Sequence, residues 1–242
     1  MKIMALDSSG LVASVAIVED DNLVAEYNIQ YKKTHSQTLL PMLDEIRRMV
    51  ELDLNSIDAI AVAAGPGSFT GLRIGSATVK GLGLALQKPI IEIPTVDGIA
   101  NNMYGTDKLV CPIMDARRNQ VYTGIYQFIP KKETETMAYQ LDVLKEQCAV
   151  PVETITEALN QMGREVIFLG DGVPVFREQL KTLMQVPYGF APAFMNRQRA
   201  AAVAGLAFDY YKAGKMVTAG EHAPEYLRLS QAERERKEKE EA

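Results

Sequence analysis

The chain has 242 residues, 47% of them hydrophobic and 24% charged, and a formal net charge of −5. This composition suits a globular protein of one or two domains, and a negative charge argues against a domain that binds nucleic acid on its own. The two cysteines, Cys111 and Cys148, match no zinc or redox spacing, and no segment has the layout of a signal peptide or a membrane span. We therefore expect a cytoplasmic protein.

The first hundred residues alternate between short apolar strands and amphipathic helices. Turn formers separate the first three strands, which predicts an antiparallel meander, and Thr34 or Ser36 is the expected N-cap of the helix that follows. The expected order is strand, strand, strand, helix, strand, helix, strand, helix, over residues 2–6, 11–18, 23–31, 39–50, 57–64, 72–86, 89–94 and 96–103.

The second half repeats the opening of the first. A strand at 109–114 runs into Asp115, turns, and resumes at 120–128, as the first strand runs into Asp7 before the next one. Such duplication predicts two related subdomains. The pattern at 131–150 gives no clear assignment. The later elements expected are a helix at 155–162, a strand at 165–169, a helix at 175–183 and a helix at 196–212 capped by Asn196.

The two Asp hairpins form the first candidate site. Asp7, Ser8 and Ser9 lie in the first turn, and Asp115 lies at the matching place in the second. Hydroxyls and turn N–H groups can hold a phosphate, and a carboxylate can organise Mg²⁺ through water. The same residue types also close hairpins without any ligand. Arg117-Arg118 departs from a Gly/Ser-rich phosphate loop, so we predict a degenerate nucleotide site.

A glycine-rich loop at 65–71 precedes the second long helix. It is neither a P-loop nor a dinucleotide fingerprint, although a loop before a helix N-terminus can suit an anion. Gly71 and Gly75 lie one turn apart, and Thr78 and Leu82 continue their line. Each interior glycine costs about 1 kcal/mol relative to alanine. The line therefore predicts a close helix contact, either within the monomer or with a partner.

The histidines argue against a metal site. His35 lies in the segment Thr34-His35-Ser36-Gln37, and a helical metal site would need a second ligand four residues later, where the chain has Leu39. The other histidine, His222, lies near the C-terminus, and no Ser or Cys has a nearby histidine base that would suggest a catalytic triad. We expect neither a metal site nor a catalytic residue.

Taken together, these segments resemble the TsaB (YeaZ) family, a subunit of the bacterial machinery that makes threonylcarbamoyladenosine in tRNA. The resemblance covers nearly the whole chain and is carried by residues 3–9, 34–37 with 40–41, 65–75, 115–117 with 121–122, 169–172 and 224–228. It implies an α/β protein of the actin/Hsp70-like (ASKHA) fold, with two related subdomains, each a mixed sheet flanked by helices. The implied N-terminal subdomain is 1–105, which carries the partner interface. The implied C-terminal subdomain is 106–230, and its helix at 196–212 is able to pack back on the N-terminal subdomain. A charged tail follows at 231–242.

The resemblance also implies a role as a non-catalytic scaffold or activating subunit. It would pair with TsaD, a catalytic paralogue with the His-x-x-x-His site that this chain lacks, to modify the adenosine next to the tRNA anticodon. TsaE is the implied third partner, tRNA would be held only through the complex, and a homodimer is the alternative assembly. No cofactor of its own is implied, apart from ATP or ADP with Mg²⁺ at the interface of the complex. The implied interface residues are Leu39, Met42, Leu43, Ile46, Ser68, Phe69, Gly71, Leu72, Arg73, Gly75, Thr78 and Leu82.

Two other functions compete with this interpretation. A nucleotide-dependent phosphotransferase or ATPase of the same fold would use Asp7 and Asp115 around Mg-nucleotide, and calorimetry on the isolated chain tests it. A metalloprotease is the weaker alternative, because the candidate site offers one histidine.

Overall fold

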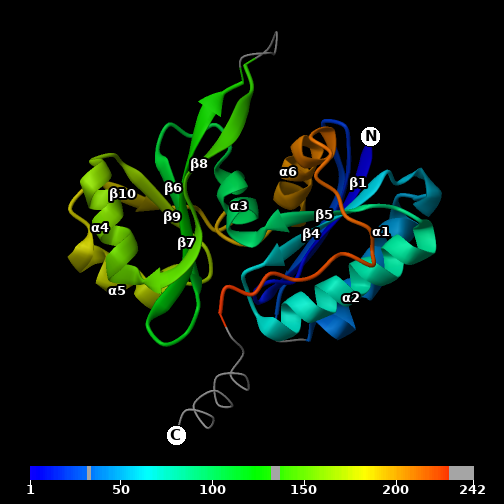
Figure 1. Ribbon diagram of the computed structural model, residues 1–242, viewed down its shortest axis with the longest axis horizontal. Coiled ribbons are helices and arrows are strands. Elements are labelled where there is room, and N and C mark those ends of the chain that lie inside the picture. The colour runs from blue at the N-terminus through cyan, green and yellow to red at the C-terminus, as the bar shows by residue number, and fades with distance from the viewer. Residues whose placement is uncertain (32–33, 132–136, 229–242) are drawn as a thin grey trace, which may run out of the picture.

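The computed structural model describes residues 1–31, 34–131 and 137–228. Two halves lie side by side, each a five-stranded sheet with helices against it (Figure 1). The first half contains β1 (Lys2–Asp7), β2 (Val12–Glu19), β3 (Asn22–Gln30), α1 (His35–Met49), β4 (Ala59–Gly65), α2 (Phe69–Leu86), β5 (Ile90–Pro94) and α3 (Thr95–Ala100). The second contains β6 (Leu109–Asp115), β7 (Gln120–Pro130), β8 (Tyr139–Pro151), α4 (Val152–Met162), β9 (Val166–Leu169), α5 (Val173–Leu183), β10 (Tyr188–Phe190) and α6 (Ala200–Lys212).

The two sheets have the same topology. The first has the order β3-β2-β1-β4-β5, and the second, read in the same sense, has the order β8-β7-β6-β9-β10. In both, the first three strands are antiparallel and the last two run parallel to the first strand. The predicted duplication is therefore confirmed, and the molecule has the expected actin/Hsp70-like α/β fold.

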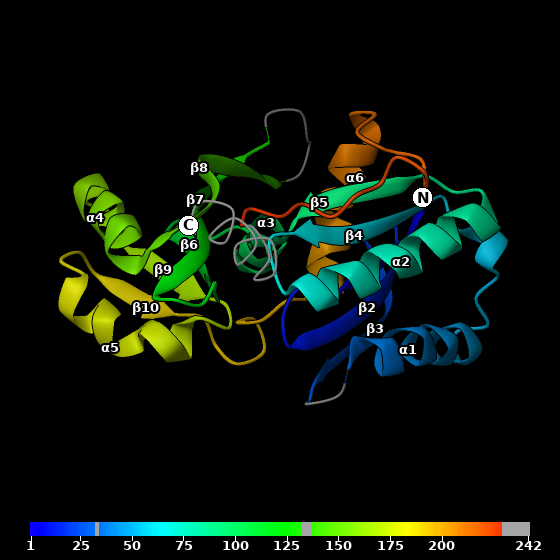
Figure 2. The same ribbon diagram turned by 60° about the horizontal axis from the view of Figure 1, so that its bottom comes forward.

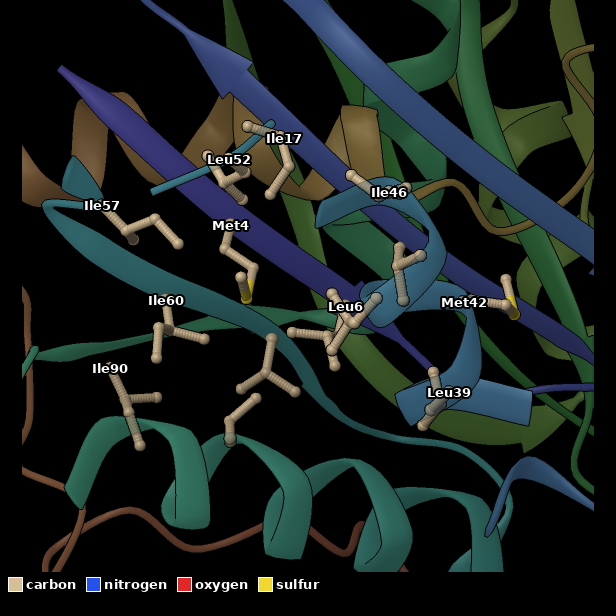
Figure 3. Close-up of a cluster of buried hydrophobic side chains, with 14 of the residues drawn as sticks. Met4, Leu6, Ile17, Leu39, Met42, Ile46, Leu52, Ile57, Ile60 and Ile90 are labelled. Atoms are coloured by element: carbon tan, nitrogen blue, oxygen red, sulfur yellow. The ribbon is translucent and has the colours of Figure 1, made fainter. Parts of the chain in front are cut away.

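Buried apolar side chains hold α1 and α2 against one face of the first sheet (Figure 3). Because successive strand residues point to opposite faces, Met4 and Leu6 pack toward α1 and α2. Ile3 and Ala5, from the same strand, pack toward α6 on the other face. The first sheet is thus covered on both sides, which explains why β1, β2, β4 and β5 are apolar almost throughout, whereas the edge strand β3 also carries polar residues.

The helices that end the two halves connect the halves to each other. α3 packs against β6 and β7 of the second sheet through Val96 and Ile99, as well as touching the first. α6 instead packs across the first sheet, through Ala200, Val203 and Ala207. Figure 2 shows α6 against β2 on the far side of the sheet from α2.

A buried carboxylate positions the N-terminus of α6. Glu26 of β3, whose side chain is 6% exposed, accepts a hydrogen bond from the Ala201 N–H at 3.0 Å and pairs with Arg199. Ser14 Oγ accepts another from the Ala200 N–H at 2.6 Å. Both acceptors satisfy helix N–H groups that have no partner within the helix. The predicted cap Asn196 is therefore wrong: the helix begins at Ala200, because β2 and β3 supply its acceptors.

Several other boundaries differ from the expected ones. α2 begins three residues earlier than predicted, at Phe69, because Ser68 Oγ caps the Gly71 N–H at 3.3 Å. Thr34 occupies the N-cap position of α1 but makes no side-chain cap hydrogen bond. The unassigned stretch at 131–150 contains most of β8, and the short strand β10 was not predicted. The predicted tail at 231–242 lies outside the described residues.

Within the described ranges, none of the helices is both long enough and apolar enough to cross a bilayer.

Candidate functional site

A cleft of about 620 Å³ separates the two halves at the point where the Asp hairpins face each other. Both halves contribute to its walls. The residues that matter for its chemistry are Ser9, Ser68, Asp115, Arg117, Asp171 and Arg228. Of the four residues predicted for a nucleotide, Ser9 and Asp115 line this cleft, whereas Asp7 and Ser8 lie buried in the turn behind it.

Asp7 is a buried carboxylate at the end of β1. Its Oδ1 accepts hydrogen bonds from the Ser9 N–H at 2.8 Å and the Ser9 hydroxyl at 2.6 Å. Burial raises the pKa of Asp7 to about 6, although the two Ser9 bonds oppose the shift and the nearby Asp171 adds to it. The folded state thus holds a proton on Asp7 at a pH where the unfolded chain has lost it.

We predict that Asp7→Asn flattens the dependence of stability on pH. A raised carboxyl pKa gives stability that is full below the unfolded pKa of 3.8 and is lost as pH rises through about 6. Asparagine keeps an oxygen for the Ser9 bonds and has no charge to bury, so the variant should be more stable than the wild type at pH 7. Urea unfolding at pH 4–7.5 measures the difference, with Asp21→Asn on an exposed turn as the control. Parallel curves for Asp7→Asn and the wild type would contradict the prediction.

In the second hairpin, Asp115 is paired with an arginine of the same turn. Arg117 donates its N–H to Asp115 Oδ1 at 2.7 Å, and its guanidinium lies 3.0 Å from Oδ2. Arg117, Arg118 and Asn119 all have positive φ, of 62°, 56° and 56°, which few residues other than glycine adopt. This turn therefore differs from a phosphate loop in both charge and backbone.

Sequence reasoning did not place Asp171 and Arg228 in the cleft. Asp171 follows β9, and its Oδ1 is buried without a hydrogen-bond partner among the described residues. Burial raises the pKa of Asp171, and the positive charge of Arg197 opposes the shift. The Gly170-Asp171-Gly172 turn is the sequence signal that could have identified it. Arg228 gives no local signal, because it reaches the cleft from the C-terminal segment.

The glycine line of α2 faces the first hairpin of the same chain. A Cβ atom added at Gly71 would lie 2.0 Å from the Ser8 carbonyl oxygen, and one added at Gly75 would lie 2.4 Å from Ser8 Oγ. Ser8 Oγ also donates a hydrogen bond to the Gly71 carbonyl at 2.9 Å. The close contact is thus internal, which corrects the alternative that Gly71 and Gly75 lie on a partner surface.

Most of the predicted interface residues share this inward direction. They lie under the surface of the chain, against the first sheet or the first hairpin, namely Leu39, Met42, Leu43, Ile46, Gly71, Leu72 and Gly75. Ser68 and Arg73 are exposed, and Phe69, Thr78 and Leu82 are half-buried. Helical periodicity selects residues that face the core, so most of the residues predicted for the interface pack inside this chain.

Exposed apolar residues also lie on α1 and α2, away from the positions that face the core. On α2, Leu84 is 69% exposed and lies on the same side of the helix as the exposed Ala77 and Gly81. On α1, Leu40 is 55% exposed, whereas Met49 lies about half a turn further round the helix, next to Tyr27 of β3. A Cβ atom added at Gly81 would meet no atom within 4 Å. We call Leu40, Ala77, Gly81 and Leu84 the outer face.

His35 makes an internal contact. Its Nε2 lies 2.8 Å from the Gly10 carbonyl oxygen, and the position one turn later is the buried Leu39. The other histidine, His222, is buried with Nδ1 2.6 Å from Glu92 Oε1. Across residues 1–31, 34–131 and 137–228, no three His, Cys, Asp or Glu side chains come together as metal ligands would.

Comparisons with known proteins agree with this architecture. Residues 22–241 match the family model described as TsaD, tRNA N6-adenosine threonylcarbamoyltransferase. The chain is 31% identical over 241 residues to the tRNA threonylcarbamoyladenosine biosynthesis protein TsaB of Bacillus subtilis, with 96% of each chain covered. It is 32% identical over 180 residues to the TsaB of Escherichia coli, covering 71% of this chain and 72% of that one.

A solved structure shows the same fold. YeaZ from Pseudomonas aeruginosa superposes with a TM-score of 0.74 at 26% identity, over 93% of this chain and 100% of that one. The matches in sequence and in structure span both halves of the molecule, including the cleft and the two outer helices. The chain belongs to the TsaB (YeaZ) family of tRNA threonylcarbamoyladenosine biosynthesis proteins.

Proposed function

We propose that this chain is a non-catalytic scaffold subunit that binds a TsaD-type threonylcarbamoyltransferase through the outer face of α1 and α2. The observation that carries the proposal is the exposure of apolar residues on two adjacent helices of a family member, with Leu40 and Leu84 both more than half exposed. Exposed apolar patches mark interaction sites, because burying them against a partner is favourable.

The geometry around His35 supports the non-catalytic part of the proposal. A helical metal site uses two histidines four residues apart. Here the second position holds Leu39, which is buried in the core and faces the sheet. A metal-dependent transfer step would therefore come from the partner. In this arrangement TsaE would be a third component, tRNA would be held by the assembled complex in the cytoplasm, and a homodimer could form when TsaD is absent.

Reconstitution tests the proposal. The chain alone should form no threonylcarbamoyladenosine on tRNA, whereas adding it to TsaD, TsaE and a source of threonylcarbamoyl-adenylate should restore formation. Activity of the isolated chain, or full activity of the mixture without it, would contradict the scaffold role.

Gly81→Arg is predicted to weaken binding to TsaD at least tenfold without unfolding the chain. The added side chain projects into open space from the outer face, so it leaves the core intact and interrupts only a partner contact. Isothermal calorimetry or a quantitative pull-down measures the affinity, and circular dichroism checks the fold. Met162→Arg, at an exposed apolar residue on α4, is the matched control and should bind as the wild type does. Equal affinity of both variants for TsaD would exclude the outer face as the surface that binds TsaD.

A second candidate function is nucleotide binding in the cleft, alone or as an ATPase. The specific observation is the 620 Å³ cleft with Ser9, Asp115 and Asp171 in its walls. The pairing of Asp115 with Arg117 opposes it, because the carboxylate that would organise Mg²⁺ is already engaged. Calorimetry of the isolated chain with ATP and Mg²⁺ tests this function. Binding that Asp171→Asn abolishes would support a nucleotide site in the cleft, and the absence of any heat of binding would contradict it. A nucleotide bound only by the mixture with TsaD would place it at the interface of the complex.

A further inference from the structure

The C-terminal segment, residues 217–228, begins on the edge of the first sheet. Val217 exchanges two backbone hydrogen bonds with Ile90 of β5, at 2.8 and 2.9 Å. Further along, the Glu225 N–H donates to the Ala64 carbonyl at 2.7 Å. In both ribbon views the orange-to-red segment follows the first half and ends between the two halves (Figures 1 and 2). We call residues 217–228 the strap.

The far end of the strap is bound to the second half. The Arg228 guanidinium donates to the carbonyl oxygens of Ala116 and Arg117, in the hairpin that forms one wall of the cleft. Gln147 of β8 donates its Nε2 to Glu225 Oε2 at 2.8 Å. The strap therefore connects the two halves across the mouth of the cleft.

The same end of the strap also rests on the N-terminal turns of α2. The Tyr226 ring stacks on Phe69 with ring centroids 4.7 Å apart and an interplanar angle of 7°. The Arg73 Nε–H donates to the Tyr226 hydroxyl at 3.3 Å. A Cβ atom at Gly65 would lie 2.1 Å from the Glu225 carbonyl oxygen, so the loop before α2 is shaped to receive the strap.

Residues 225, 226 and 228 hold the end of the strap by contacts near the surface, with Leu227 against the core of the second half, whereas Ala219 and His222 nearer its start are buried in the first half. Tyr226 is 39% exposed, and Glu225 and Arg73 are exposed as well. Segments held by few apolar contacts and exposed hydrogen bonds open with free energies well below that of global unfolding. Opening the strap would free the 116–117 hairpin from α2 while α3 and α6 keep the two halves joined.

We propose that the strap is a latch that sets the opening of the cleft, and that a partner bound to the outer face tightens it through the Tyr226–Phe69 stack. Phe69 and Arg73 lie in the first two turns of the helix that also carries Ala77, Gly81 and Leu84, so this one helix links the latch to the outer face. The second part rests on the proposed function, while the first concerns the chain alone. By reciprocity, losing the latch lowers partner affinity as much as partner binding closes the latch.

Hydrogen exchange on the full chain tests the latch without any partner. Tyr226→Ala and Arg228→Ala should speed exchange of the hairpin amides at 116 and 120 by about tenfold, the factor that corresponds to about 1.4 kcal/mol of lost closure. Small-angle scattering should show a larger radius of gyration. Tyr31→Ala, an exposed tyrosine, and Arg177→Ala, whose guanidinium covers Phe190 within the second half, are the matched controls.

Tyr226→Phe separates latch loss from general damage, because it keeps the ring stack and should exchange as the wild type does. Unchanged hairpin exchange in both Tyr226→Ala and Arg228→Ala, with the fold intact, would overturn the latch.

The second part of the proposal, that a bound partner tightens the latch, is tested by measuring the affinity for TsaD. Arg228→Ala should lower it about fivefold, the low end of usual coupling between sites, although Arg228 lies outside the outer face. Faster hairpin exchange with unchanged affinity would overturn the coupling. A Gly81→Arg variant that still binds TsaD would instead overturn the docking surface, so failure of the latch and failure of the proposed function give different results.

Discussion

Replacing Gly71 with alanine is expected to lower the free energy of unfolding by about 3 kcal/mol or more. The new Cβ, attached directly to the backbone of α2, would lie 2.0 Å from the Ser8 carbonyl oxygen. Because that oxygen is also part of the backbone, no flexible side chain can move aside. Either α2 or the β1–β2 turn must shift, which breaks the Ser8–Gly71 hydrogen bond and disturbs the cleft wall at Ser9. Urea unfolding followed by circular dichroism measures the loss.

Gly81 offers a matched control on the same helix. It lies in open space, so alanine there should raise stability by about 0.5–1 kcal/mol, since glycine in a helix interior is entropically costly. A Gly71→Ala variant as stable as Gly81→Ala would mean that the close approach of α2 to the first hairpin does not exist. Gly75→Arg, placed against Ser8, is likewise expected to unfold the domain rather than to act on a partner.

Glu26→Ala is expected to cost about 3 kcal/mol, below the upper range for a broken buried ion pair because the partner Arg199 is 34% exposed. The substitution removes the acceptor of the Ala201 N–H and leaves the Arg199 guanidinium without its carboxylate. Since α6 covers one face of the first sheet, the loss should affect the whole molecule. Thermal or urea unfolding measures it.

The control for Glu26 is Glu178, a carboxylate on the surface. Its side chain is 81% exposed and pairs with Lys181 on the same helix, so Glu178→Ala should change stability by less than about 0.5 kcal/mol. The double variant Glu26→Ala with Arg199→Ala should recover part of the loss, because no uncompensated charge remains. Additive losses would mean that the two side chains are not coupled.

Local patterns in the sequence predicted most of the fold. The strands of the first sheet were placed within about two residues, a margin usual for boundaries, because turn formers such as Asp7 and Ser8 separate apolar runs. β10 was missed because three residues carry no pattern. The start of α6 was misplaced because its caps, Glu26 and Ser14, are more than 170 residues away in the chain. Long-range partners of this kind leave no local signal.

The candidate site was less predictable. Of the residues predicted for a nucleotide, Ser9 and Asp115 line the cleft, whereas Asp171 and Arg228 come from elements whose approach to it depends on the complete fold. On the outer helices, the regular apolar residues are the ones the core requires. Exposed apolar residues such as Leu84 can be recognised only when burial is known, because periodicity alone does not separate them from the core positions.

The position of α6 has a consequence for synthesis on the ribosome. The face of the first sheet that carries Ile3 and Ala5 is covered by a helix that ends at Lys212. More than a hundred residues must therefore be added after α3 before that face is buried, a delay of roughly 5–20 s at usual elongation rates. During that time the nascent chain presents an uncovered apolar sheet, which is the kind of surface that chaperones bind.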